Sequence, residues 1–231
     1  MYVPAHFAMT DEQISDALMH IGSADLVTLH DDGMVATYLP FFYDPDLGPH
    51  GALLAHVARN NTQWSKRSIG ESLVIAHVAD HYVSPTWLPS AADHENATPT
   101  WDYVTVHIYG QLIAHDDQEW TEDVVRRLTE RQESELEVHW SVDDTNAGFI
   151  ESMLRAVVGI ELRITRIEGK AKMAQNKPVE DVRALAATLE QRGDAAGAQW
   201  LREVSLPAAQ RRAETLAEVR AFDQARRARP E

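Results

Sequence analysis

The stretch YVTVHIYGQLIA, Tyr103–Ala114, is the strongest strand signal in this chain of 231 residues and decides the fold class. Val, Ile, Thr and Tyr dominate it, and these residues favour the pleated, half-buried surface of a sheet. Gly110 interrupts its interior, where a glycine marks a bulge or the close approach of another backbone. Because twelve residues exceed the usual strand length, we expect this strand to bend.

Further strand signals lie on both sides of this stretch. Asp25–Leu29 and Met34–Phe41 flank His30-Asp-Asp-Gly33, where the Asp-Gly pair supplies the positive φ of a hairpin turn. Leu73–Val78 and Ile160–Ile167 are two more predicted strands. Since helices of uneven length interrupt these strands, the pattern favours an α+β barrel with peripheral helices over a doubly wound sheet.

Helices are predicted between and after the strands. The first begins at the capping box Thr10–Gln13 and ends near Gly22. Apolar residues between Leu53 and Ala58, after the turn at residues 48–51, predict a short amphipathic helix that runs to about Gln63. The remaining predicted helices are Trp120–Glu137, Ala147–Val158, Val182–Gln191, Ala195–Val204 and Ala208–Ala228, with breaks at Gly193 and Pro207.

Strand signal disappears from Val179 onward, where only helical segments follow. We therefore expect two parts, a strand-rich domain over residues 1–178 and a helical C-terminal extension over residues 179–231.

Charge is divided unevenly along the chain, whose formal net charge is −15. Residues 1–125 hold three basic side chains, Arg59, Lys66 and Arg67, against eighteen acidic ones, and residues 126–231 balance to zero. A nucleic acid or an anionic membrane requires a dense positive surface, so both are disfavoured as partners. In the acidic half, an anionic cofactor can find cations at those three residues alone.

Composition and motifs exclude several kinds of chemistry. The chain has no cysteine, which removes disulfides, thiolate nucleophiles and cysteine-ligated metals. No export signal or long apolar segment occurs, so a cytoplasmic protein is expected. Signatures of Rossmann dehydrogenases, P-loop NTPases, zincins and α/β-hydrolases are missing. His77 and His81 would lie about 13 Å apart on one strand, too far to share an ion, so we predict no metal and place them with Asp80 on an outer sheet face or rim.

One run, His56–Trp64, combines cationic, amide and aromatic side chains at the C-terminal end of the predicted helix. Arginine is a planar partner for phosphate, and tryptophan offers a flat face to an aromatic ring. The run therefore fits a phosphate-plus-ring ligand, but also a helix C-terminus whose cation offsets the dipole and whose tryptophan packs in the core. Its candidate ligand-binding residues are His56, Arg59, Asn60, Gln63 and Trp64.

Two other runs carry candidate ligand-binding residues. Residues 82–87 and 98–103 are hydroxyl-rich and aromatic segments at strand ends, which suit either ligand orientation or proline-fixed turns with buried rings. Residues 167–177 contain three lysines and two amides, which suit either an anion site or a solvated loop. The candidates from these runs are Tyr82, Ser84, Trp101, Lys170, Lys172, Gln175 and Asn176.

Six segments of the chain together resemble one known family: MYVPAHF (1–7), ATYLPF (36–41), GALLAHVARNNTQW (51–64), YVSPTW (82–87), PTWDYVTVHIYG (99–110) and ESMLRAVVGIELRITRIEGKAKMAQN (151–176). Taken in order, these segments resemble the PaiB family, FMN-binding split-barrel proteins that are labelled negative transcriptional regulators. In the last segment, Met173-Ala174 stands where the family has leucine-serine, so one hydroxyl is lost.

The resemblance implies a six-stranded split β-barrel, a homodimer, and FMN held near the subunit interface, as in the related pyridoxamine-phosphate oxidases and flavin reductases. The function expected from it is that of an FMN-binding regulatory protein. Because the chain carries no helix-turn-helix with a basic second helix, any effect on transcription is expected to be indirect rather than through direct DNA binding. The alternative is a flavin-dependent oxidoreductase or haem-handling enzyme of the same superfamily, in which the cofactor supplies the chemistry.

Overall fold

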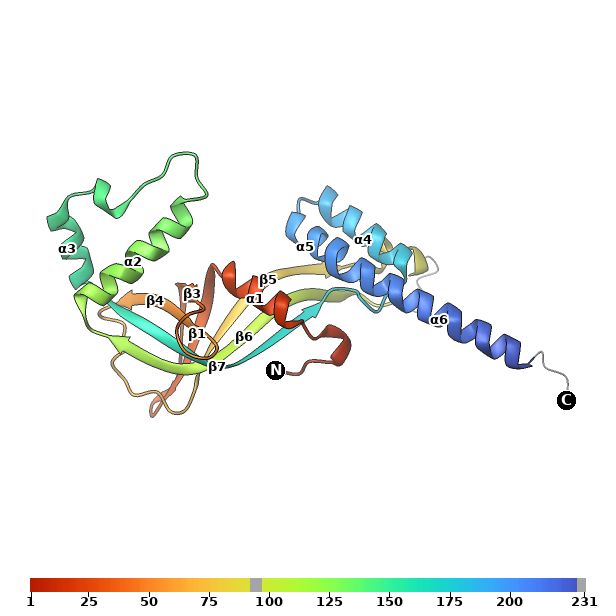
Figure 1. Ribbon diagram of the computed structural model, residues 1–231, viewed down its shortest axis with the longest axis horizontal. Helices are drawn as coiled ribbons and strands as arrows, with labels where there is room; N and C mark the ends of the chain where they lie inside the picture. Colours follow the sequence, from red (N-terminus) through yellow and green to blue (C-terminus); the bar gives the residue numbers. More distant parts are fainter. Residues whose placement is uncertain (92–96, 228–231) are drawn as a thin grey trace. The chain divides into compact units, whose positions relative to one another are not determined.

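The computed structural model describes residues 1–91 and 97–227, which form two compact units (Figure 1). The first unit contains Met1, Met9–His77 and Val106–Gly169, and the second contains Tyr2–Ala8, Val78–Thr105 and the chain from Lys170 onward. Both units therefore hold strand residues. The division into a domain over residues 1–178 and an extension beyond it stays a prediction.

A single antiparallel sheet of seven strands runs in the order β2-β1-β5-β6-β7-β4-β3 and, within the residues described, is not closed. The strands are β1 (Ser23–His30), β2 (Gly33–Pro40), β3 (Phe42–Asp44), β4 (Ala52–Ala58), β5 (Ser72–Val83), β6 (Thr100–His115) and β7 (Val157–Lys172). The α+β class is confirmed. The count of six strands is not, because β3 adds a short edge strand that pairs with β4.

Strand β4 corrects the prediction of a helix that starts at Leu53. Residues Ala52–Ala55 are buried in succession, and β4 pairs with β3 on one side and with β7 on the other. A strand covered on both faces is apolar without alternation, so its pattern imitates the apolar face of a helix. Arg59 consequently follows a strand and does not end a helix of its own.

Two predicted local features of the sheet are confirmed. β1 and β2 form the expected hairpin, with Gly33 at a φ of 126°. Gly110 is a point of close backbone approach, because a Cβ there would lie 2.2 Å from the carbonyl oxygen of Arg163 in β7. A side chain at position 110 would therefore force β6 and β7 apart.

Three α-helices belong to the first unit: α1 (Asp11–Met19), α2 (Gln118–Glu133) and α3 (Ala147–Arg155). The predicted capping box is present, since Thr10 accepts from the backbone N–H of Gln13 and the Gln13 side chain accepts in return. Helix α2 packs on β4 through an apolar cluster, and its Trp120 ring covers Gly159 of β7. The cluster consists of Ala52, Leu54, Val124 and Leu128, with Phe42 and Trp120 against it. Short 3₁₀ turns occur at η1 (Ala5–Phe7) in the second unit and η4 (Val142–Asp144) in the first.

The second unit gathers the C-terminal helices around the ends of β5, β6 and β7 (Figure 1). Its elements are η2 (Pro85–Trp87), η3 (Pro89–Ala91), α4 (Val179–Gln191), α5 (Ala195–Trp200), the π-helical turn Leu201–Ser205 and α6 (Leu206–Arg227). The predicted break at Gly193 is confirmed by its φ of 84°. The predicted break at Pro207 is wrong: the backbone stays helical from α5 through the π-helical turn into α6, and Pro207 follows that turn, which already departs from the i→i−4 ladder that a proline interrupts.

Helix α4 supplies most of the core of this unit through Val182, Leu185 and Leu189, all at most 2% exposed. Its buried Asp181 accepts from the backbone N–H and the hydroxyl of Ser90, which fastens η3 to the helix. The predicted end of α6 at Ala228 lies outside the described residues. None of the helices described is long and apolar enough to cross a membrane.

Candidate functional site

The candidate ligand-binding residues divide between the two compact units. His56, Arg59, Asn60, Gln63 and Trp64 belong to the first unit. The second unit holds Tyr82, Ser84, Trp101, Lys170, Lys172, Gln175 and Asn176. Contact of these residues with a ligand stays a prediction, but their bonds show what each side chain already does.

Arg59 follows β4 and uses its guanidinium within the protein. Nη1 donates to Asp116 at 2.7 Å, and Nε and Nη2 donate to the backbone carbonyls of Arg155 and Val157 at 2.7 and 3.0 Å. These bonds tie the end of β4 to the start of β7 and to the residues before α2. The Trp64 indole N–H donates to the carbonyl of Arg59 and holds the turn from the other side.

Gln63 is 1% exposed and fastens the turn to the β1–β2 hairpin. Its amide Nε2 lies within hydrogen-bond distance of three acceptors, the carbonyls of Leu26 and Val35 and the hydroxyl of Thr28, and its Oε1 accepts from Thr37. Both N–H groups and one oxygen lone pair of this buried amide are therefore engaged. Gln63 therefore shapes the turn rather than offering a group to a ligand.

Asn60 and His56, the other two candidates of the first unit, do not take part in these bonds. Asn60 is exposed, and among the described residues its side chain makes no hydrogen bond. His56 in β4 is half-buried, and its Nδ1 is enclosed without a partner in the part of the chain described. Burial lowers the pKa of His56 below its ordinary value, because the charged imidazolium loses its hydration.

Aromatic rings gather at the ends of β5 and β6 in the second unit. The Tyr82 ring lies 6.1 Å from Trp87, edge to face, and 6.2 Å from Trp101. Tyr82 and Trp101 are 44% and 51% exposed, so the alternative of fully buried rings is wrong for both. The Trp101 indole donates to Asp80 at 3.1 Å, while the Tyr82 hydroxyl has no hydrogen bond within the described residues.

The two lysines at the end of β7 differ in their partners. Lys172 donates to the hydroxyl of Thr100, to the carbonyl of Trp101 and to Asp102. Lys170 is 9% exposed, and its side chain has no carboxylate or hydrogen-bond partner among the described residues. Its ammonium lies instead 5.1 Å from the ring centre of Tyr103 and 5.8 Å from that of Tyr2. Lys170 is thus a largely buried side chain whose charge has no anionic partner within the described residues.

The turn that follows β7 is built by its own side chains. Gln175 accepts from the backbone N–H of Met173 and donates to the carbonyl of Ala171, and Ala174 adopts a φ of 61°. The side chain of Asn176 is exposed and makes no hydrogen bond in the described part of the chain. At the other strand end, the Ser84 hydroxyl accepts from the backbone N–H of Thr86 and so caps η2.

A buried titratable cluster lies beside these residues and corrects one prediction. His77 and Asp80 are exposed as expected, but His81 is not on an outer face, because α5 covers it: its side chain is 7% exposed and its Nδ1 is 3.4 Å from Asp194. Burial is the largest influence on its pKa, which it lowers, and Asp102, Asp194 and Asp80 oppose that shift. The pKa of Asp102 is raised, because its burial outweighs the attraction of Lys172.

A cavity of about 430 Å³ opens next to this cluster. It is lined by Leu189, Arg192 and Asp194 from the end of α4 and the following turn, together with His81, Tyr82, Ser84 and Trp87. Sequence reasoning identified Tyr82 and Ser84 but missed the other residues. Arg192 and Asp194 lie more than one hundred residues further along the chain, and no local pattern links them to η2.

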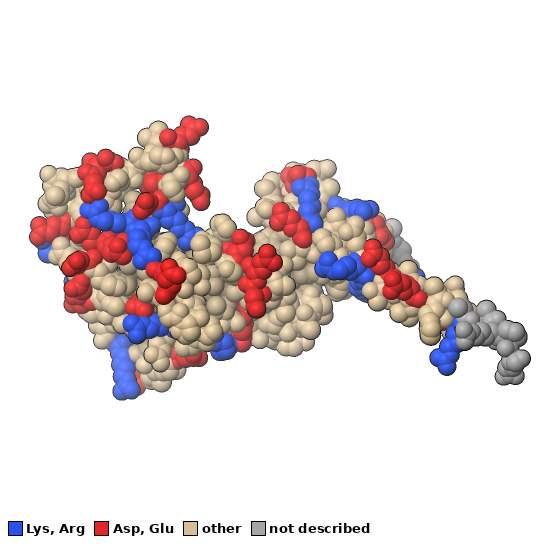
Figure 2. Space-filling view, in the orientation of Figure 1, with Lys and Arg blue, Asp and Glu red and all other residues tan. Residues whose placement is uncertain are grey.

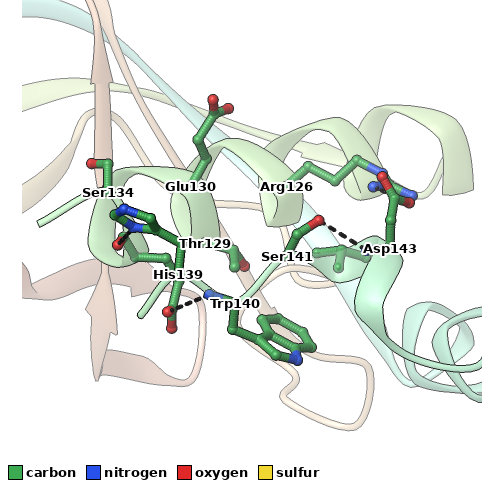
Figure 3. Close-up of a pocket in the computed structure, with 10 residues that line it drawn as sticks. Arg126, Thr129, Glu130, Ser134, His139, Trp140, Ser141 and Asp143 are labelled. Carbon is green, nitrogen blue, oxygen red and sulfur yellow. Dashed lines mark hydrogen bonds and ion pairs between the residues drawn. The ribbon is translucent and has the colours of Figure 1, made fainter. Parts of the chain in front are cut away.

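Two cavities of the first unit are poorer candidates for a ligand site. One of about 570 Å³ lies between α2 and the chain that follows it (Figure 3), and none of the candidate residues lines it. Its polar groups already bond to one another: Arg126 pairs with Asp143, and the Trp140 backbone N–H donates to Glu133. A second, of about 350 Å³, includes Arg59 beside Asp116. Within the described residues, no group of three metal-ligating side chains comes together.

Comparison with known proteins identifies the family. Residues 1–166 match the family model described as "Putative FMN-binding domain". The chain is 27% identical over 183 residues to the protease synthase and sporulation protein PAI 2 of Bacillus subtilis, covering 78% of this chain and 85% of that protein. It is 37% identical over 106 residues to the uncharacterized protein YKL070W of Saccharomyces cerevisiae, covering 45% of this chain and 62% of that protein's length.

Solved structures resemble the fold at low sequence identity. The conserved hypothetical protein Rv2991 of Mycobacterium tuberculosis superposes with a TM-score of 0.53 at 13% identity, over 77% of this chain and 94% of the other. The flavocytochrome Anf3 of Azotobacter vinelandii superposes with a TM-score of 0.51 at 12% identity, over 74% and 72%. These likenesses support the architecture described above.

Proposed function

Because the chain belongs to this FMN-binding family, and FMN is therefore its cofactor, we propose that it is a PaiB-like regulatory flavoprotein in which Lys170 is the principal cationic contact of the flavin. The single observation behind that role is the state of Lys170. Its side chain is largely buried, and its ammonium lies near two tyrosine rings with no anionic partner among the described residues.

An unpaired buried cation is unfavourable unless a ligand or a π-system compensates its lost hydration. The rings of Tyr2 and Tyr103 compensate part of that cost in the free protein. FMN would supply an anionic group for the ammonium and a flat ring system beside an exposed aromatic side chain, which Trp101 provides in the same unit. Asn176 of the same unit offers a free amide and completes the proposed set of contacts.

The remaining candidates have a different role in this proposal. Arg59, Gln63 and Trp64 form the turn after β4, whereas Lys172 and Gln175 form the end of β7. Their side chains are engaged in bonds that hold backbone segments. They act as positioning residues, and their substitution should change stability more than flavin affinity.

A fluorescence titration tests the assignment. FMN is added to flavin-free protein and its quenching is measured for wild type, Lys170→Met and the control Lys66→Met, which removes an exposed lysine paired with Asp32. Loss of one charge-assisted contact should weaken FMN binding about tenfold in Lys170→Met and leave the control unchanged. Equal affinity in all three proteins would contradict the role of Lys170, and absence of saturable quenching in wild type would contradict flavin binding itself.

Regulation is proposed from the Bacillus relative, whose name links it to protease synthesis and sporulation. Charge supports an indirect effect on transcription. Over α4 to α6, Figure 2 shows basic side chains interspersed with acidic ones on the face in view. On α6, Arg211, Arg212 and Arg220 alternate with Glu214 and Glu218. A gel shift at about 150 mM salt should show no defined DNA complex, since weak electrostatic binding is lost as salt rises; a sequence-specific complex would refute indirect action.

A homodimer is also proposed, as the family resemblance implies. Helix α6 presents three exposed apolar side chains, Leu216, Val219 and Phe222, which a second copy could cover. Sedimentation velocity should give twice the chain mass of 25.9 kDa. A single monomeric species at micromolar concentration would contradict the dimer.

A further inference from the structure

We propose that the cavity between α4 and η2 in the second unit binds a small aromatic carboxylate, as a ligand separate from FMN. The cavity, about 430 Å³ in volume, lies within the range of small-molecule sites. All its lining residues belong to one compact unit, so the site is complete within that unit.

The lining is rich in unused hydrogen-bond donors. Within the described residues, neither the Tyr82 hydroxyl nor the Trp87 indole N–H makes a hydrogen bond, and the Arg192 guanidinium has no carboxylate partner. Arg192 lies 5.0 Å above the Trp87 ring, where stacking holds its planar fork at the cavity. Three donors without acceptors favour a ligand that brings acceptor oxygens.

The walls favour a flat ring. Tyr82 and Trp87 meet edge to face at 6.1 Å, and Leu189 adds an aliphatic surface. Aromatic side chains in this arrangement pack well against a third ring. The chemistry of the lining thus combines an apolar aromatic wall with a single free guanidinium.

The charge of the cavity limits the anion to a single negative charge. Asp194 lines the cavity together with Arg192, so the two formal charges cancel. A carboxylate can pair with the guanidinium at moderate cost, whereas a phosphate dianion would be repelled by Asp194. A monoanionic aromatic acid therefore fits better than an aromatic phosphate.

His81 forms part of the inner wall of the cavity. Its side chain is 7% exposed, and its Nδ1 lies 3.4 Å from Asp194. Both ring nitrogens are closed to solvent, so they are not open to a ligand in the cavity. The backbone of α5 is fixed against this ring, because a Cβ at Gly197 would lie 2.8 Å from Nδ1. The imidazole is therefore held in place as a wall, and the donors for a ligand are those of Tyr82, Trp87 and Arg192.

The test uses the full chain and 4-fluorobenzoate as the probe, followed by broadening of its ¹⁹F resonance. Wild type should bind it, and Arg192→Gln should bind about tenfold more weakly, because the charge-assisted contact is lost. Arg183→Gln is the matched control, since Arg183 is an exposed arginine of the same helix with no partner among the described residues. Trp87→Leu should weaken binding as well.

Three further measurements decide between explanations. Equal broadening of uncharged 4-fluorobenzyl alcohol, or equal weakening by Arg183→Gln, would show non-specific adsorption and overturn the proposal. Tighter binding of phenyl phosphate would overturn the choice of a carboxylate. Saturation with FMN should leave the ¹⁹F signal of the bound probe unchanged, and displacement of the probe by FMN would show that the cavity belongs to the flavin. Loss of FMN binding in Lys170→Met, with binding of the probe unchanged, would bear on the flavin site alone and not on this cavity.

Discussion

The turn after β4 and the ends of β5 to β7 carry the same kinds of side chain, but they differ in what those side chains bond to. In the turn, the side chains of Arg59 and Gln63 donate to backbone carbonyls and to neighbouring side chains. At the strand ends and the end of α4, the side chains of Lys170, Tyr82 and Arg192 make no hydrogen bond or ion pair within the described residues.

This difference in bonding separates structural side chains from ligand-binding side chains, although both kinds are of the same residue types in the sequence. A cation whose geometry is satisfied by the protein stabilises a backbone conformation, whereas a cation left without an anion is ready for a ligand. Substitutions in the first region should therefore lower stability with little effect on ligands, and substitutions in the second should do the reverse.

The largest expected effect is that of Gln63→Met. The substitution keeps most of the side-chain volume but leaves the buried carbonyl of Leu26 and the hydroxyl of Thr28 without their donor. Unfolding free energy should fall by about 3 kcal/mol, the cost of leaving such groups unpaired. Urea denaturation measures it, with the exposed Asn60→Ala as a control expected to change by less than about 0.5 kcal/mol. Equal stability of the two variants would remove Gln63 from its structural role.

A smaller loss is expected for Arg59→Met. Three hydrogen bonds disappear, but the side chain is 43% exposed and water replaces part of them. Unfolding free energy should fall by about 1 kcal/mol, and FMN affinity should stay within twofold of wild type once the protein is folded. A tenfold loss of FMN affinity at unchanged stability would make Arg59 a ligand contact and break the comparison.

Acid should destabilise the first region through His56. Its pKa is lowered by burial in the folded state, so below pH 6.5 the unfolded chain binds a proton that the folded chain excludes. Stability is lost as pH falls, with a slope of at most about 1.4 kcal/mol per pH unit from this group. Urea denaturation at pH 7.5 and 5.5 should show a smaller loss for His56→Leu than for wild type; parallel losses would assign the acid sensitivity to other groups.

The smallest effect on stability is expected for Lys170→Met, the substitution that should weaken FMN binding most. Lys170→Met removes a charge that has no carboxylate partner among the described residues and keeps the apolar stem of a largely buried side chain, so unfolding free energy of the flavin-free protein should change by less than about 1 kcal/mol or rise. Thermal unfolding without FMN measures it. A loss comparable to that of Gln63→Met would show that Lys170 is structural and would end the contrast between the two regions.

Features set by neighbouring residues were predictable from the sequence. The capping box at Thr10, the β1–β2 hairpin and the close approach at Gly110 each follow from residue types at fixed spacing. That β4 is a strand was not predictable in the same way. Its residues form an unbroken apolar run that suits enclosure by β3, β7 and helix α2, and this enclosure exists only after folding.

The candidate site shows the same limit. Residue type identified Tyr82 and Lys170, because aromatic and cationic side chains at strand ends are suited to anionic ring ligands. Residue type could not separate Lys172 from Lys170, since their difference is the presence of Asp102 beside one of them. The cavity residues Arg192 and Asp194 were missed because α4 and the turn after it bring them to η2 across half the chain.

The attachment of the C-terminal helices to the end of β7 has a practical consequence for producing fragments of this protein. The Ser205 hydroxyl donates to the carbonyl of Met173, Arg212 donates to the carbonyl of Asn176, and Met173 itself is fully buried. A chain shortened after residue 178 would expose Met173 and the apolar faces of η2 and η3 that α4 contacts. Such a fragment should collect in inclusion bodies on expression, whereas a chain ending beyond Arg212 should remain in solution.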